Sequence, residues 1–181
     1  AGYQGRVEDR LRAWQDADEH DYELERCRRL GIHSLTARQV RRLYDYFLRI
    51  AEGEGLPLEN KPAPEEAIRR CLLTGFADQI ARRVDGGTLR CELVHGRTGV
   101  LARESVVRSS PFLVAGEVRE VEGKGRRDLN VLLGLVTAIE PAWLEEMFPG
   151  AIREETHVVL DTVAKRVIAQ RIRRFRDLTL E

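Results

Sequence analysis

The most constraining feature of this sequence is a change in its hydrophobic period at Gly86-Gly87. Before this point, apolar residues recur every three or four positions, which is the period of an amphipathic helix. After it, apolar and polar residues alternate, as in residues 89–93, and this is the period of a strand with one buried face. The segregation of the two patterns predicts an α+β fold, with a helical domain at residues 1–86 and a β domain at residues 87–181.

Three helices are predicted in the helical domain. The first begins near Val7, and the second follows a Thr-x-x-Gln capping box formed by Thr36 and Gln39. A proline-rich connector, residues 56–64, separates the second helix from a third, which is predicted to run from Pro64 to Gly86. The apolar faces of these helices consist of Val7, Leu11 and Trp14, of Val40, Leu43, Phe47 and Ile50, and of Ile68, Leu72, Phe76 and Ile80.

The β domain contains five or six predicted strands and one short helix. Residues 131–139 are almost continuously apolar, which indicates a central strand covered on both faces. Pro141 opens the short helix, which buries Trp143, and residues 158–160 and 167–169 can pair as a C-terminal hairpin. A region of this length fits a small antiparallel barrel such as the OB-fold, whose face and loops can hold single-stranded nucleic acid.

Composition limits the classes of site that this chain can carry. Lys plus Arg and Asp plus Glu each total 30, so a nucleic-acid site has to come from local clustering of cations. Cys27, Cys71 and Cys91 form a poor disulfide framework, and Cys91 with His95 lacks the second pair that a zinc site needs. No apolar run approaches the roughly 20 residues that span a bilayer. We therefore expect a soluble, cytoplasmic protein with no metal and no membrane partner.

Clustered cations are the one functional signal in the sequence. One cluster lies in a Gly-rich loop between two predicted strands, and Arg97 occupies another short glycine turn. The last 21 residues form a second cluster, and for both clusters a solvated surface is the alternative interpretation. The arginines of residues 1–60 have many acidic neighbours, so pairing within the chain is expected there. The loop cations are Lys124, Arg126 and Arg127, and those of the C-terminal cluster are Lys165, Arg166, Arg171, Arg173, Arg174 and Arg176.

Several segments resemble, in the same order, the C-terminal region of bacterial DEAH-box ATP-dependent helicases of the HrpB type. Residues 68–83, IRRCLLTGFADQIARR, resemble the last helix before the OB-fold of that family. Residues 139–144, IEPAWL, resemble its strand followed by x-Pro-x-Trp-Leu. The other segments are less specific, although the resemblance covers nearly the whole chain. Parts of residues 9–40 resemble the helicase-associated (ratchet-like) helical region of the family. Residues 92–99 and 111–118 resemble strands and a turn of its barrel, and residues 155–174 resemble its C-terminal hairpin and basic tail.

The resemblance implies that this chain is an accessory fragment of a helicase. Such a fragment would contact single-stranded nucleic acid, RNA in preference to DNA, and would dock on the RecA-like domains of its parent chain. The ATPase motifs Gly-x-x-x-x-Gly-Lys-Ser/Thr and Asp-Glu-Ala-His are absent from the 181 residues. ATP and Mg²⁺ are therefore expected to bind the RecA-like ATPase domains, which this sequence does not include. No cofactor and no catalytic residue are expected here. A stand-alone OB-type nucleic-acid-binding or protein-interaction module is the alternative. An independent small-molecule enzyme is disfavoured, because no spacing places an acid, base or nucleophile.

Overall fold

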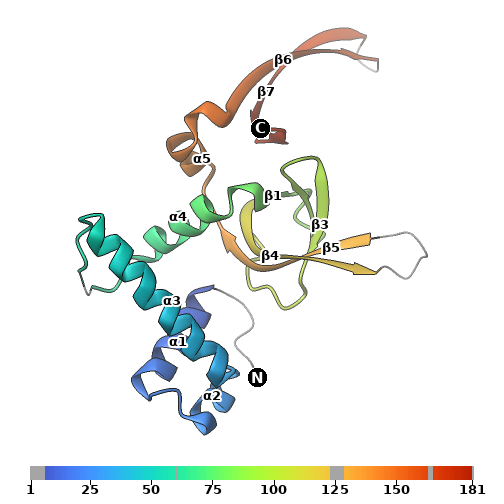
Figure 1. Cartoon of the computed structure of the whole chain (residues 1–181). Helices are drawn as coiled ribbons and strands as arrows, with labels where there is room; N and C mark the ends of the chain where they lie inside the picture. The colour runs from blue at the N-terminus through green and yellow to red at the C-terminus, as the bar shows by residue number, and fades with distance from the viewer. Residues whose placement is uncertain (1–6, 60, 123–128, 163–164, 181) are drawn as a thin grey trace. The chain divides into compact units, whose positions relative to one another are not determined.

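A computed structural model describes residues 7–59, 61–122, 129–162 and 165–180 (Figure 1). The chain divides into two compact units, residues 1–68 and 69–181, which are described separately below. The sequence pattern placed its boundary later, at residues 86 and 87. The difference arises because the segment before Gly86 contains a barrel strand as well as a helix.

The first unit consists of α1 (Val7–Glu19), α2 (Leu24–Leu30) and α3 (Ser34–Gly53). Its core is small and is made by Ala17, Tyr22, Cys27 and Ala37. The indole Nε1 of Trp14 donates a hydrogen bond to the carbonyl of Ala37 at 3.2 Å, which joins α1 to α3. The predicted face of α3 remains largely outside this core, with Val40, Leu43, Phe47 and Ile50 each 44–61% exposed.

The capping box predicted at Thr36 and Gln39 is wrong. α3 begins at Ser34, and the side chain of His33 caps it by accepting a hydrogen bond from the backbone N–H of Thr36. The expected pairing of arginines in this unit is confirmed for three of them. Ion pairs join Arg26 to Asp16, Arg28 to Glu25, and Arg41 to both Asp18 and Asp45.

The predicted third helix is too long. α4 (Glu65–Gly75) stops at its glycine, and a short 3₁₀ turn, η1 (Ala77–Gln79), leads into the first strand, β1 (Ile80–Arg83). β1 pairs with two other strands, β2 (Arg90–Leu93) and β4 (Phe112–Glu122). The spacing of Leu72, Phe76 and Ile80 suits a helix, but pairing on both edges of the strand overrides that local preference.

Five strands close into a barrel with the order β1-β2-β3-β5-β4, which fits the predicted OB-like fold (Figure 1). The barrel is mixed, because β3 and β5 are parallel whereas the other four neighbouring pairs are antiparallel. β3 begins at Arg97, so residues 97–99, predicted as part of a turn, are in a strand. The remaining bounds are β3 (Arg97–Leu101) and β5 (Leu129–Ala138).

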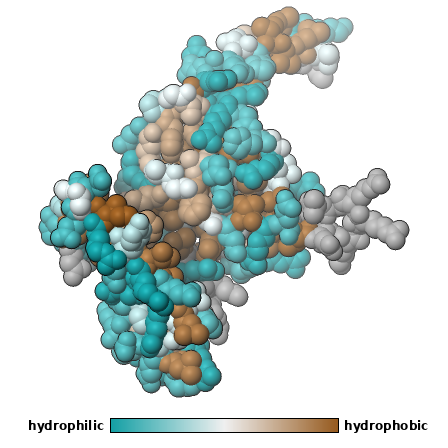
Figure 2. Space-filling model, viewed as in Figure 1, coloured by the Kyte–Doolittle hydropathy of each residue, from teal (hydrophilic) through white to brown (hydrophobic). Residues whose placement is uncertain are grey.

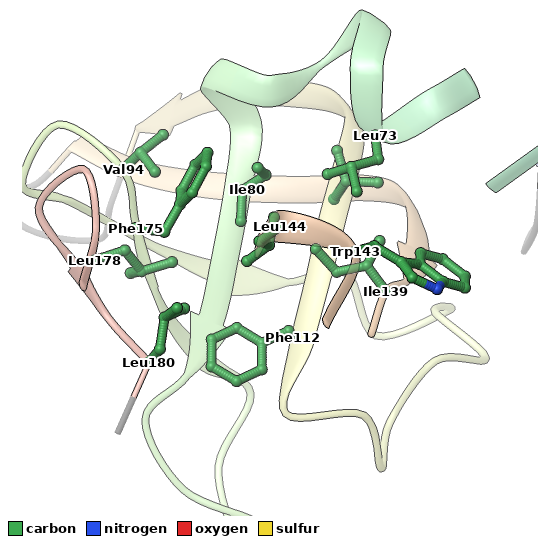
Figure 3. Packing of buried hydrophobic residues seen from close by; sticks show 11 residues of the cluster. Leu73, Ile80, Val94, Phe112, Ile139, Trp143, Leu144, Phe175, Leu178 and Leu180 are labelled. Carbon is green, nitrogen blue, oxygen red and sulfur yellow. The ribbon is translucent and has the colours of Figure 1, made fainter. Parts of the chain in front are cut away.

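Two apolar clusters hold the second unit together. The first draws on all five barrel strands and fills the barrel: Ala81, Cys91, Leu93, Leu101, Leu113, Ala115, Leu133 and Val136. The second lies between the barrel wall, α4, α5 (Pro141–Met147) and the C-terminal strands (Figure 3). Its members are Leu73, Ile80, Val94, Phe112, Val114, Ile139, Trp143, Leu144, Phe175, Leu178 and Leu180. Neighbouring residues such as Ile80 and Ala81 thus enter different clusters, as the alternation of a strand requires.

The predicted C-terminal hairpin is confirmed and is longer than expected. β6 (Ile152–Asp161) pairs with β7 (Arg166–Phe175) over ten residues, and β8 (Leu178–Thr179) joins β7 at its end. Phe175, Leu178 and Leu180 anchor the base in the second cluster. The other end of the ribbon is apolar and exposed, as the brown atoms there show (Figure 2), with Val158 and Val167 70% and 68% exposed.

Candidate nucleic-acid interface

Arg97 serves a structural purpose in the barrel. Its guanidinium Nη2 donates a hydrogen bond to the carbonyl of Asp78 at 2.8 Å, and Nε lies 3.5 Å from the carbonyl of Val94. These contacts join η1 to the turn between β2 and β3. Two of the donors that a phosphate could use are therefore engaged by backbone carbonyls.

The Gly-rich loop joins β4 to β5, where Glu122 pairs with Leu129. Its predicted contact residues Lys124, Arg126 and Arg127 lie outside the described residues. The position of the loop in the chain agrees with the OB-fold, in which the loop between the fourth and fifth strands takes part in ligand binding. Nucleic-acid contact by these three side chains stays a prediction.

The cations of the ribbon fall into two groups. Arg173 lies 2.6 Å from Glu145 and 3.5 Å from Glu154, and Arg174 lies 3.7 Å from Glu155. These two arginines are partly buried and belong to the ion pairs at the base. In contrast, Lys165, Arg166 and Arg171 are exposed, and none of them forms an ion pair with a carboxylate of the described residues. The second group is the better candidate for binding phosphates.

The outer surface of β2 carries a cation from the neighbouring strand that is already paired. Arg82 of β1 forms a 2.8 Å ion pair with Glu92 of β2, which neutralises that part of the sheet. Arg90 is exposed at the beginning of β2. Charge that could attract a phosphate backbone is therefore concentrated on the ribbon instead of this face.

The loop between β1 and β2 is closed by hydrogen bonds of its own. The Asp85 carboxylate accepts bonds from the backbone N–H groups of Gly87 and Thr88, both at 2.7 Å, and from the Thr88 hydroxyl. These bonds lower the pKa of the Asp85 carboxyl below its ordinary value. The Arg83 guanidinium donates to the Thr88 carbonyl at 2.6 Å. The loop is thus fixed in shape, and its one carboxylate is ionised and satisfied.

Sequence reasoning missed a second basic site near the ribbon. The structure brings His95, Arg153 and Arg176 to one open pocket, although they come from three separate segments. No local motif marks them, and only Arg176 belongs to a cluster visible in the sequence. The register of β6 and β7, which the sequence does not fix, is what places Arg153 there.

The described residues contain no candidate metal centre, and the barrel cysteine is buried. No group of three or more His, Cys, Asp or Glu residues could hold a metal ion among the residues that are described. Burial raises the pKa of the Cys91 thiol to about 11, so this cysteine packs as an apolar residue in the barrel. The described helices are all too short or too polar to cross a bilayer.

The fold is similar to that of solved helicase structures. A crystal structure of the E. coli DExH-box NTPase HrpB matches with a TM-score of 0.55 and 20% sequence identity, over 74% of this chain and 16% of that chain. A crystal structure of the Escherichia coli DEAH/RHA helicase HrpB matches with a TM-score of 0.51 and 22% identity, over 68% of this chain and 15% of that one. This chain thus spans about one-sixth of the length of the structures it matches. No protein-family model matches the sequence. No curated protein sequence matches it either.

Proposed function

We propose that this chain is the C-terminal accessory region of an ATP-dependent helicase of the DEAH/RHA class. The observation that carries the proposal is the fold likeness to HrpB, which covers 68–74% of this chain but only 15–16% of the solved chains. The ordered sequence resemblance, from the last helix before the barrel to the IEPAWL segment, points to the same region. ATP and Mg²⁺ would bind elsewhere in the parent protein, on RecA-like domains.

The accessory region would contact a single strand through phosphate charge. Lys165, Arg166 and Arg171 support this role, because they are exposed on one ribbon and form no ion pair with the carboxylates that the structure describes. Long cations without fixed geometry bind phosphates and do not read base edges, so affinity would be independent of sequence. By resemblance the strand is RNA in preference to DNA. A cytoplasmic location, expected from the composition of the sequence, is also part of the proposal.

Docking on the RecA-like domains would use apolar surface. The α3 face and the end of the ribbon both expose large apolar side chains, and contiguous exposed apolar surface is typical of protein interfaces. The ribbon residues concerned are Val158, Val159, Leu160, Val167 and Ile168. If the proposal is correct, the coding sequence upstream of Ala1 encodes two RecA-like domains. A reading frame without them would favour the stand-alone OB-type module.

Strand binding is tested with the chain itself and fluorescent single-stranded oligonucleotides of about 16 nucleotides, long enough for one OB-fold. We expect Lys165→Ser/Arg166→Ser/Arg171→Ser to bind several-fold more weakly in an anisotropy titration. It should also flatten the slope of log K against log salt by about 0.7 for each phosphate that the variant no longer neutralises.

The control for this test removes the same charge from exposed positions of the first unit and its connector, with Arg12→Ser/Arg28→Ser/Lys61→Ser. This control should leave affinity and slope close to those of the unchanged chain. Equal weakening by both triple variants would overturn the ribbon as the binding surface, because only net charge would then matter.

A further inference from the structure

Two turns of the second unit are joined through one carboxylate. Asp177, between β7 and β8, accepts hydrogen bonds from the backbone N–H groups of His95 and Gly96, at 2.9 and 2.6 Å. Next to it, the backbone N–H of Arg176 donates to the carbonyl of Ala151 at 2.7 Å. These bonds hold the β2–β3 turn, the start of β6 and the β7–β8 turn together.

An open pocket of about 550 Å³ lies at this junction. Its lining residues are His95, Gly150, Ala151, Arg153, Arg176 and Asp177. The guanidinium of Arg176 is held over the ring of Phe175, 5.3 Å from its centroid, and Nη1 lies 3.4 Å from the carbonyl of Ala77. Because Phe175 is fully buried in the apolar cluster, this arginine rests on a fixed support.

Arg153 has an acidic neighbour on β6, Glu155, whose pKa is lowered by a hydrogen bond from His157 and, to a lesser degree, by the charge of Arg153, although Arg153 and Glu155 form no ion pair. Arg153 stands directly opposite Arg174 in the β6–β7 ladder, and like charges in that relation destabilise a sheet. The nearby Glu155 is engaged by Arg174 at 3.7 Å and His157 at 3.1 Å. Within the described parts of the chain, neither Arg153 nor Arg176 forms an ion pair.

Asp177 is the one acidic residue among the described residues that line the pocket, and its two oxygens accept the N–H groups of the β2–β3 turn. The pocket lining thus holds two guanidinium groups, one imidazole and a single carboxylate, so the arginines outnumber the acidic residues. An anion of the size of phosphate would supply the negative charge that both arginines of the lining can bind through charge-assisted hydrogen bonds.

The backbone at the junction is also strained. His95 and Arg176 have φ values of 66° and 55°, in the left-handed region that few residues other than glycine adopt, histidine being among the less rare. Such conformations persist where the surrounding structure enforces them, and they gather at binding and catalytic sites. Here both residues line the same pocket.

We propose that this pocket is a phosphate-binding site, with Arg153 and Arg176 as the ligands of the phosphate and His95 as a further N–H donor. The planar fork of arginine matches two oxygens of a phosphate group, which lysine cannot do. The phosphate can belong to a nucleic-acid backbone or to a small phosphorylated molecule. Only the first source rests on the proposed function.

Inorganic phosphate is the first probe, titrated into the ¹⁵N-labelled full chain and followed by NMR. We expect the amide signals of His95, Gly96 and Arg176 to shift with a millimolar dissociation constant. In Arg153→Gln/Arg176→Gln the affinity should fall at least about tenfold, since two charge-assisted hydrogen bonds to the phosphate are removed. Arg12→Gln/Arg28→Gln, which removes the same charge from the first unit, should bind phosphate like the unchanged chain.

A conservative double variant separates the loss of the guanidinium groups from a folding defect. Arg153→Lys/Arg176→Lys keeps both charges but removes the guanidinium forks, so it should bind phosphate more weakly than the unchanged chain and more tightly than the Gln variant. The proposal is overturned if phosphate shifts none of these signals. It is also overturned if both pocket variants bind phosphate as the unchanged chain does, with unchanged circular dichroism.

A single-stranded oligonucleotide is the second probe, and it identifies the source of the phosphate. If the strand affinity of the Gln variant also falls about tenfold, the ligand is a phosphodiester of the strand. If only phosphate binding falls, the pocket takes a small phosphorylated molecule. A chain that binds phosphate but no strand would refute the proposed strand-binding function and leave the pocket standing.

Discussion

The guanidinium of Arg70 lies over the indole ring of Trp143, 5.0 Å from the ring centroid. This cation–π contact joins α4 to α5 at the edge of the second apolar cluster, where Trp143 is 9% exposed. Arg70 also forms a 2.8 Å ion pair with Glu146 of α5. The two helices that flank the barrel are thus tied by one arginine as well as by apolar packing.

Trp143→Ala should destabilise the second unit by about 3 to 5 kcal/mol, because it removes a large buried side chain and leaves a cavity beside Leu73 and Ile139. The measurement is urea unfolding followed by far-UV circular dichroism. Phe47→Ala is the control, since Phe47 is 61% exposed on α3 and its removal should cost within about 0.5 kcal/mol. Equal midpoints for Trp143→Ala and the unchanged chain would mean that α5 does not pack on the barrel.

Asp177→Asn tests the hydrogen bonds that link the β7–β8 turn to the β2–β3 turn. Burial opposes ionisation of Asp177, but hydrogen bonds from the N–H groups of His95 and Gly96 outweigh it and lower the pKa of the carboxyl. Asp177→Asn should therefore cost about 1 kcal/mol at pH 7, as charge-assisted bonds are replaced by weaker ones.

The pH dependence of this cost follows from the direction of the shift. A carboxyl with a lowered pKa in the folded state stabilises the fold above its unfolded pKa, about 3.9, and the contribution disappears as pH falls through the folded value. The difference in unfolding free energy between the unchanged chain and Asp177→Asn should thus be constant near neutrality and shrink below about pH 4. A difference that grows on acidification would contradict this.

Gly99 is required by the packing of the barrel interior. A Cβ at this position would lie 3.1 Å from Leu133 and 3.2 Å from Leu93. Gly99→Val should therefore overpack the barrel and lower the unfolding free energy by about 1 to 3 kcal/mol. Gly86→Val is the matched control, because a Cβ at Gly86 meets nothing within 4 Å. If thermal unfolding midpoints of both variants coincide, the barrel tolerates side chains at position 99.

The sequence predicted the elements whose local pattern agrees with their final environment. The apolar run at residues 131–139 became β5, which pairs with both β3 and β4 as a central strand does. The hairpin and the buried Trp143 were also predicted correctly. In these segments, periodicity, turn residues and tertiary contacts favour the same structure.

Other features depend on distant partners and could not be predicted. Ile80 has helical spacing from Phe76 but belongs to β1, which exists because β2 and β4 supply its hydrogen bonds. Phe112 and Val118 are six positions apart on β4, which would put them on one face of a regular strand, yet they pack in different clusters. The alternation changes along β4 and β5 where Leu135 adopts a φ of 48°, and no residue type announces such a change.

The candidate cations illustrate the same limit. Arg171 and Arg173 are two residues apart on β7 and look equivalent in the sequence, but Arg173 is paired with Glu145 and Glu154 whereas Arg171 is exposed. Which cation is paired depends on the register of β6 and on the position of α5. The pocket at Arg153 depends on the same register, so the sequence alone could not indicate it.

ATP hydrolysis should be absent from the isolated chain. The groups that hold the β- and γ-phosphates and Mg²⁺ in this class of helicase are not encoded in the 181 residues. We therefore expect phosphate release at the level of a protein-free blank, with and without single-stranded nucleic acid. Nucleic-acid-stimulated turnover that persists through rigorous purification would contradict the assignment to an accessory region.

Lys124, Arg126 and Arg127 are expected to act through phosphate charge if the loop between β4 and β5 meets the strand. Replacing all three with Ser should weaken single-strand binding about equally for every base sequence, because cations in a Gly-rich loop lack the fixed geometry of base readout. The slope of log K against log salt should flatten by up to about 0.7 for each phosphate that these cations neutralise in the unchanged chain. Unchanged affinity and slope, with the ribbon variant still impaired, would assign the strand to the ribbon and leave this loop as a solvated turn.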